Sequence, residues 1–129
     1  MPKTVLLVED NPDNRLLIHM IFRRFTKDSI KVIDAQDGEE GLKLAFENQP
    51  DLILMDLKMP KMDGFEAIVK LRSDPATLEI PIIVLSAQVM DEDTQRALDA
   101  GAQGFLSKPI DIAKFSETVR PYIEETASS

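Results

Sequence analysis

The chain has 129 residues, a length that fits one ordinary domain. Its 23 acidic and 15 basic residues give a formal net charge of −8, and this charge disfavours binding to nucleic acid. The absence of cysteine excludes disulfides, thiolate nucleophiles and cysteine-ligated metals, and a single histidine excludes a histidine-rich metal cluster.

Five short apolar runs predict the strands of a sheet. They occupy residues 5–8, 30–35, 52–55, 82–85 and 104–106. Most are unbroken stretches of valine, isoleucine and leucine, a pattern that is typical of parallel strands covered on both faces. The second run contains Lys31 and Asp34, and its greater polarity predicts a position at an edge of the sheet.

Segments with helical periodicity separate the apolar runs. Helices are expected after Asn11 and Pro12, from Asp37, from about Gly64, after Ser86, and after Pro109 and Asp111. Apolar residues recur at helical spacing in four of these segments: Leu17, Ile21 and Phe25; Leu42, Ala45 and Phe46; Phe65, Ile68 and Leu71; and Ile112, Phe115, Val119 and Ile123. The fourth helix is expected to end at Ala100, because Gly101 suits a C-terminal cap. Strands and helices that alternate in this way predict an α/β fold with a parallel sheet between helices.

Chemically active side chains follow four of the five apolar runs. Glu9 and Asp10 end the first run, Asp56 the third and Ser86 the fourth, and Lys108 follows the fifth. In an open α/β sheet, ligands bind beyond the carboxyl ends of the strands. If the first and third strands are neighbours, three carboxylates, a lysine and a hydroxyl converge at one edge of the sheet.

The chemistry of this group predicts a phosphoryl-transfer site. Three carboxylates at close range require a cation, because like charges raise one another's pKa. Oxygen ligands with room for water suit Mg²⁺. The lysine would offset the charge of a bound anion, and Ser86 and the backbone amides of Ala87 and Gln88 could donate to it. Together these groups predict transfer of a phosphoryl group to a carboxylate.

Five motifs resemble the receiver domain of bacterial two-component response regulators. They are Val-Glu-Asp-Asn at 8–11, Leu-Ile-Leu-Met-Asp at 52–56, Met-Pro-Lys-Met-Asp-Gly at 59–64, Leu-Ser-Ala at 85–87 and Gly-Phe-Leu-Ser-Lys-Pro at 104–109. The match covers nearly the whole chain at the family's order and spacing. It implies one three-layer, doubly wound, flavodoxin-like domain over residues 1–125, with a five-stranded parallel sheet in the order 2-1-3-4-5 and five helices. Residues 126–129 are expected to form a frayed tail.

The resemblance implies a role for each residue of the site. Asp56 would be the phosphoacceptor, which attacks a phosphohistidine on a histidine kinase or histidine phosphotransfer protein. Asp10 and Asp56 would bind Mg²⁺ directly, Glu9 would bind it through water, and the backbone carbonyl of Lys58 would complete the protein ligands. Lys108 would contact the phosphoryl oxygens.

The resemblance also implies a conformational switch. Ser86 would move toward the phosphoryl group, the backbone amide of Ala87 would bind that group, and Phe105 would turn inward. The Lys108–Pro109 peptide bond is expected to be cis. A downstream protein would bind the face made by the fourth helix, fifth strand and fifth helix, which includes Val89, Arg96, Phe105 and Lys114.

These inferences together predict a signalling switch and not an enzyme. It would act as a monomer or weak dimer with protein partners and without a nucleic-acid or membrane partner. The N-terminal apolar run, residues 5–8, is too short for a signal peptide or a membrane span, so a cytoplasmic location is expected.

The residues leave three alternatives to a signalling switch. A small phosphatase or hydrolase with an aspartyl nucleophile is one alternative, but haloacid-dehalogenase-type enzymes need an acid two residues after the nucleophile, where this chain has Lys58. A flavodoxin would have a phosphate loop rich in threonine, serine and glycine, where residues 9–12 are largely acidic. A degenerate receiver that acts only as a binding module is the third. Lys58 and Gln88 occupy positions that tune acyl-phosphate hydrolysis in the family, so the lifetime of the phosphoryl group is left open.

Overall fold

A computed structural model of the chain describes residues 3–26, 30–57, 64–86 and 92–123. Within these residues, five parallel strands form one sheet in the order β2-β1-β3-β4-β5. The strands are β1 (Lys3–Val8), β2 (Ile30–Ala35), β3 (Leu52–Asp56), β4 (Ile82–Ser86) and β5 (Gly104–Ser107). The predicted strands and strand order are confirmed, and the polar second strand lies at an edge.

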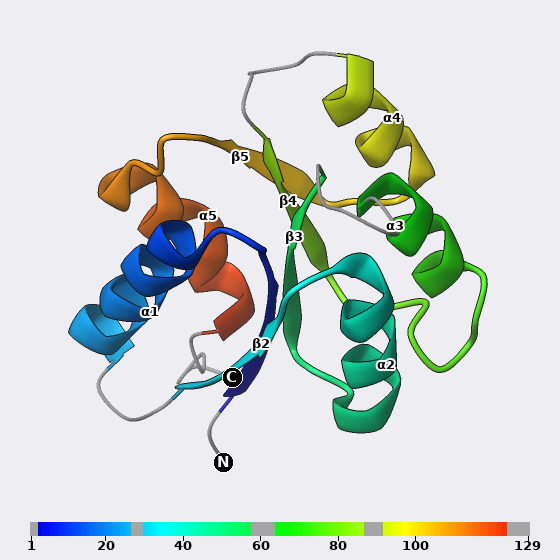
Figure 1. Cartoon of the computed structure of the whole chain (residues 1–129), viewed down its shortest axis with the longest axis horizontal. Coiled ribbons are helices and arrows are strands. Elements are labelled where there is room, and N and C mark those ends of the chain that lie inside the picture. Colours follow the sequence, from blue (N-terminus) through cyan, green and yellow to red (C-terminus); the bar gives the residue numbers. More distant parts are fainter. Residues whose placement is uncertain (1–2, 27–29, 58–63, 87–91, 124–129) are drawn as a thin grey trace.

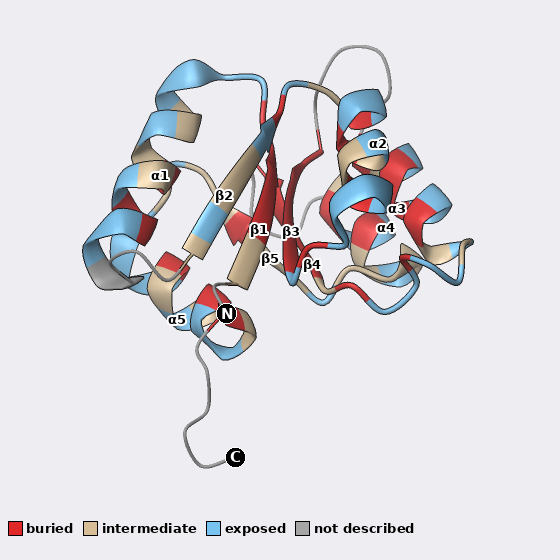
Figure 2. Cartoon of the chain, turned by 90° about the horizontal axis from the view of Figure 1, so that it is seen from below, coloured by how far each residue is buried: buried red, intermediate tan, exposed pale blue. Residues whose placement is uncertain are grey.

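Helices cover both faces of the sheet. They are α1 (Pro12–Thr26), α2 (Gly38–Asn48), α3 (Gly64–Arg72), α4 (Glu92–Ala100) and α5 (Ile112–Ile123). Figures 1 and 2 show α1 and α5 on one side of the sheet and α2, α3 and α4 on the other. The predicted three-layer, doubly wound arrangement is therefore confirmed. Among the described residues, no helix is long and apolar enough to cross a membrane.

The apolar strands supply two cores, one on each face. Leu6, Ile53 and Val84 pack in the core beneath α2, α3 and α4. Their chain neighbours Leu7 and Leu54 pack in the core beneath α1 and α5. This division follows from the strand, because successive side chains point to opposite faces. Because helices cover both faces of the sheet, a central strand needs apolar side chains at successive positions.

Side-chain caps begin three of the helices. Asn11, Asp37 and Asp111 each accept a hydrogen bond from a backbone N–H in the first turn of α1, α2 and α5, at 2.8, 2.9 and 3.0 Å. At the other end of a helix, Gly101 follows α4 with a φ of 125°, a conformation that other residues rarely adopt. The predicted cap residues are thus confirmed in the structure.

The Arg72 side chain joins two loops at the end of the sheet away from the strand carboxyl ends. Its guanidinium donates to the Gly101 carbonyl at 3.0 and 3.1 Å and to the Leu78 carbonyl at 2.9 Å. It also donates to the side chain of Gln103 at 2.9 Å. Burial lowers the pKa of Arg72 from its ordinary value. This group of bonds, the Arg72 clamp, ties the end of α3 to the end of α4.

Helical periodicity predicted that two apolar side chains would be buried, but the structure shows them exposed. Phe46 is 41% exposed and Ile112 is 52% exposed. Phe46 follows the buried Ala45 by one residue, so the helix turns it away from the core, and Ile112 is the first residue of α5. The side chain of Phe25, the expected start of the fourth helix directly after Ser86 and the expected tail at 126–129 lie outside the described residues.

Gly64 gives a test of how tightly α3 packs against β3. A Cβ atom at Gly64 would collide with the backbone of Asp56 and Leu57. We expect Gly64→Ala to lower the free energy of unfolding by about 1–3 kcal/mol, because rigid backbone must shift. Urea unfolding followed by circular dichroism measures this. Gly104→Ala is the control, since its Cβ would meet only the end of Ile83 at 3.4 Å, and equal stability of the two variants would contradict the packing.

Candidate functional site

The carboxyl ends of four strands meet at one edge of the sheet. Backbone hydrogen bonds continue the pairing just beyond the strands: Glu9 N–H donates to the Ala35 carbonyl at 3.0 Å, and Lys108 N–H donates to the Ser86 carbonyl at 2.7 Å. Asp56, the last residue of β3, pairs in register with Leu85 of β4. The parallel register therefore brings the residues that end these strands to a common rim.

A cleft lies at this rim. Its lining contains the predicted site residues Glu9, Asp10, Asp56, Ser86 and Lys108, together with Asn11, Asn14, Leu57, Leu85 and Asp93. Asn14 and Asp93 were not predicted from the sequence. Asn14 lies one helical turn after Asn11, so the predicted cap at Asn11 could have indicated its position. The position of Asp93 depends on how α4 packs against the sheet.

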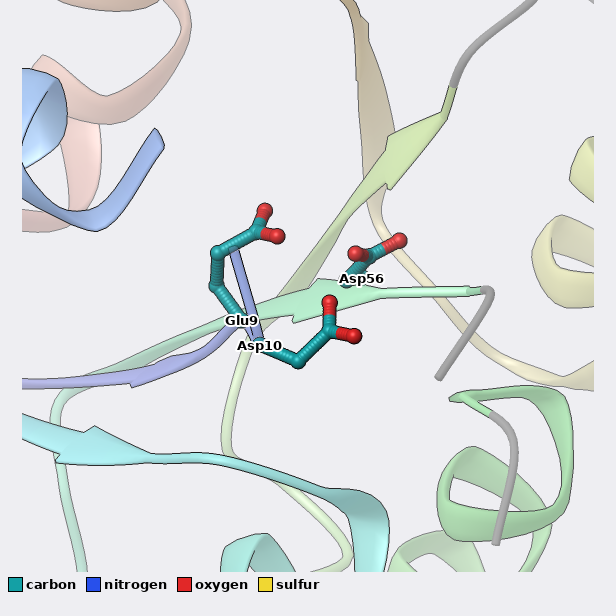
Figure 3. A group of neighbouring side chains, drawn as sticks. All are labelled: Glu9, Asp10 and Asp56. Atoms are coloured by element: carbon teal, nitrogen blue, oxygen red, sulfur yellow. The ribbon is translucent and has the colours of Figure 1, made fainter. Parts of the chain in front are cut away.

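Three carboxylates form the acidic part of the cleft. Glu9 is fully buried, Asp56 is 5% exposed, and Asp10 is exposed. One oxygen from each lies within 4.8 Å of an oxygen of the others. Figure 3 shows the three carboxyl groups gathered at the ends of β1 and β3. The backbone N–H of Asn11 donates to Glu9 Oε2 at 3.2 Å and fixes that side chain on one side.

Lys108 lies between the two buried carboxylates. Its Nζ donates to Asp56 Oδ2 at 3.0 Å and forms an ion pair with Glu9 Oε1, also at 3.0 Å. Among the described residues, Glu9 Oε1 is a buried oxygen with no hydrogen bond of acceptable geometry, although it has this ion pair. One ammonium group thus serves two carboxylates and leaves one buried oxygen incompletely satisfied.

The local charges shift two pKa values. Burial, and then the negative charge of Asp56, raise the pKa of Glu9 from 4.5, and the nearby Lys108 offsets this only in part. Burial alone would lower the pKa of Lys108, but the charges of Asp56 and Glu9 outweigh it and raise that pKa above 10.5. Lys108 is therefore a cation at neutral pH, and it is the one basic side chain among the described residues that line the cleft.

The donor set suits a hard divalent cation such as Mg²⁺. All three side chains offer carboxylate oxygens, which Mg²⁺ prefers over nitrogen and sulfur ligands. The buried Glu9 Oε1 has electron pairs that the described residues do not fully use. Exposed Asp10 leaves one side of the group open to solvent, which fits a cation that keeps part of its hydration.

The hydroxyl of Ser86 is bonded toward α4. Thr94 Oγ1 donates to Ser86 Oγ at 2.8 Å. Thr94 is fully buried, and Ser86 is 5% exposed. Ser86 was predicted from the sequence and Thr94 was not, because a threonine in the first turn of a helix has no distinguishing signal until the helix is placed.

The remaining predicted residues have these positions. Phe105 of β5 is half-buried and packs against the core on the α4 side of the sheet. Arg96 and Lys114 are exposed, and the Arg96 guanidinium lies 4.1 Å from the centre of the Phe65 ring. The Lys108–Pro109 bond is cis, as expected. Four further residues lie outside the described residues: Lys58, Ala87, Gln88 and Val89.

Comparisons with known proteins give one consistent result. The family model of the response regulator receiver domain matches residues 5–120. The polar-differentiation response regulator DivK of Brucella anthropi is 37% identical over 123 residues, which cover 95% of this chain and 98% of DivK.

Solved structures agree with this match. The receiver domain of a sensor histidine kinase from Pseudomonas aeruginosa, with a magnesium ion coordinated in its active site cleft, has a TM-score of 0.84 and 30% identity and covers 95% of this chain and 98% of its own. The Vibrio cholerae chemotaxis protein CheY4 has a TM-score of 0.84 and 28% identity and covers 95% of this chain and 100% of its own.

The raised pKa of Glu9 predicts a pH-dependent stability without metal. A carboxyl group with a raised pKa stabilises the fold below its ordinary pKa of 4.5, and this contribution is lost as the pH rises through the raised value. Glu9→Gln keeps a neutral side chain at every pH. We therefore expect Glu9→Gln to be more stable than wild type at pH 7 in EDTA, with a smaller difference below pH 4.5.

Urea unfolding across this pH range measures the difference. Glu117→Gln removes an exposed carboxylate from α5 and is the matched control, for which we expect no such divergence from wild type. Parallel stability curves for wild type and Glu9→Gln would contradict the electrostatic description of the cluster.

Proposed function

The chain belongs to the response regulator receiver family, and from that premise we propose that its Asp56 accepts a phosphoryl group from a histidine kinase or histidine phosphotransfer protein. The observation that carries this proposal is the position of Asp56. Its carboxylate is buried at the end of β3, bound to Lys108 at 3.0 Å, and grouped with Glu9 and Asp10. A carboxylate placed opposite a fixed cation is suited to act as a phosphoryl acceptor.

Asp56 would act as the nucleophile. One of its carboxylate oxygens attacks the phosphorus of the phosphohistidine, an O–P bond forms, and the N–P bond breaks. The imidazole leaves with the electron pair of the N–P bond and remains on the partner protein. Lys108 Nζ, 3.0 Å from Asp56 Oδ2, would balance negative charge on the transferred oxygens. Because this cation is held by two buried carboxylates, it is in place before the reaction begins.

We propose that the acidic cluster holds Mg²⁺ during this transfer. Asp10 and Asp56 would be direct ligands, Glu9 would act through water, and the Lys58 carbonyl would be the remaining protein ligand. When bound, the ion supplies positive charge that neutralises the carboxylates and the phosphoryl oxygens. The magnesium ion in the related Pseudomonas receiver domain supports this assignment, as does the buried Glu9 Oε1.

The signal would leave the site through a change in protein binding. After transfer, Ser86 would move toward the phosphoryl group, where the Ala87 amide also binds, and Phe105 would turn inward. The face made by α4, β5 and α5 would then change its preference for a downstream protein, as expected for a two-state switch biased by a local charge. We propose that the receiver domain spans residues 1–125 and works as a switch that does not turn over a substrate.

Phosphorylation can be tested directly. After incubation with acetyl phosphate and Mg²⁺, we expect mass spectrometry to show one phosphoryl group that hydroxylamine removes, because it is an acyl phosphate. Asp56→Asn should abolish it, whereas Asp99→Asn, at an exposed position on α4, should retain it. An unmodified wild-type protein would reduce the chain to a binding module. Steady release of phosphate from unrelated phosphate esters would support a phosphatase.

Metal binding can be tested through stability. Mg²⁺ should raise the melting temperature of wild type, because an ion that binds only the folded state stabilises it by about 2.7 kcal/mol at 100 times its Kd. Asp10→Asn should lose most of this gain while folding normally, since Asp10 is exposed. Asp13→Asn, an exposed carboxylate nearby on α1, is the control. Equal gains in Asp10→Asn and wild type would contradict the assignment.

A further inference from the structure

A buried hydrogen bond connects the proposed phosphorylation site to α4. Thr94, in the first turn of α4, donates its hydroxyl to Ser86 Oγ at 2.8 Å. Neither side chain is open to solvent, since Thr94 is fully buried and Ser86 is 5% exposed. Water therefore cannot easily replace this bond when it breaks, so its loss affects the structure more than the loss of a surface bond would.

Ser86 lies next to both the proposed phosphorylation site and α4. It is the last residue of β4, it lines the same cleft as Asp56 and Lys108, and its backbone carbonyl accepts from Lys108 N–H at 2.7 Å. Its side chain lies on the α4 face of the sheet, where Val84, two residues earlier, packs in the core that includes Ala97. The hydroxyl thus stands between the reacting carboxylate and the buried side of α4.

Thr94 and Ala97 are the buried residues of α4 within its described length. Both are small, so within the described length of α4 the fully buried side chains offer little apolar surface to the sheet. Further along, the Arg96 guanidinium rests on the ring of Phe65 in α3 at 4.1 Å and holds the middle of α4. The hydrogen bond of Thr94 is therefore a specific tie for the first turn.

We propose that Thr94 is a positioning residue that holds the Ser86 hydroxyl toward α4 and opposes its movement toward a phosphoryl group on Asp56. This inference rests on the proposed function. Phosphorylation exchanges the Thr94–Ser86 bond for a bond from Ser86 to a phosphoryl oxygen. The first turn of α4 then loses its hydrogen bond to Ser86, so that phosphorylation of Asp56 changes the surface of α4.

Fluoroberyllate with Mg²⁺ is the probe for the test, because it mimics a phosphoryl group on a carboxylate and binds reversibly. Thr94→Val has a similar shape without the hydroxyl, so the hydrogen bond from Thr94 to Ser86 is absent before the probe binds. We expect its apparent Kd for fluoroberyllate, measured by calorimetry, to be about fivefold lower than that of wild type, the equivalent of one hydrogen bond. Thr94→Ser restores the hydroxyl and should restore the wild-type Kd.

Thr77→Val is the matched control for the loss of a buried hydroxyl. Thr77 is fully buried, and its hydroxyl donates to the Leu71 carbonyl at 2.7 Å, in the loop between α3 and β4. We expect this variant to lose stability without any change in the Kd for fluoroberyllate. If Thr94→Val does not fold, Thr94→Ala compared with Thr77→Ala provides the same test.

Hydrogen exchange of α4 gives a second measurement. Fluoroberyllate should speed exchange in the first turn of α4 in wild type, and Thr94→Val should already show the faster exchange without the probe. A Thr94→Val variant that binds fluoroberyllate with the wild-type Kd, or more weakly, overturns the role of Thr94 while wild-type binding still supports the proposed function. Failure of wild type to bind the probe overturns both.

Discussion

The repulsion between carboxylates at the ends of β1 and β3 is the constraint on which the site depends. Parallel strands bring Glu9, Asp10 and Asp56 to one rim, and burial of Glu9 prevents water from screening them fully. A single ammonium group, Lys108, lies 3.0 Å from two of these side chains. Among the described residues the site is thus incompletely neutralised, and under the proposed function an added cation or phosphoryl group would act on this charge imbalance.

Much of the fold was predictable because it follows from burial on both faces of a parallel sheet. Short apolar runs, most of them unbroken, located the strands, and cap residues such as Asn11 and Asp37 located helix starts. Periodicity was less informative at the borders of a helix face, where Phe46 lies next to a buried residue but faces solvent. The order of the strands came from resemblance to a family, since apolar runs carry no information on which strands are neighbours.

The candidate site was predictable where it depends on strand ends and not where it depends on helix placement. Glu9, Asp56 and Lys108 lie in the cleft because each ends or directly follows a strand. Thr94 and Asp93 have no such signal, because α4 buries only small side chains within its described length, and Leu98 alone among its large residues is apolar, so the pattern does not show which side faces the sheet. Tertiary packing alone sets that orientation.

The Arg72 clamp has a mechanical consequence for α4. Its bonds to the Gly101 carbonyl hold the C-terminal end of the helix to α3, the Arg96–Phe65 contact holds the middle, and the Thr94 hydroxyl bonds the first turn to β4. A rod held along one half bends away most at its other end. Under the proposed switch, α4 would therefore be displaced least near Ala100 and most near Glu92.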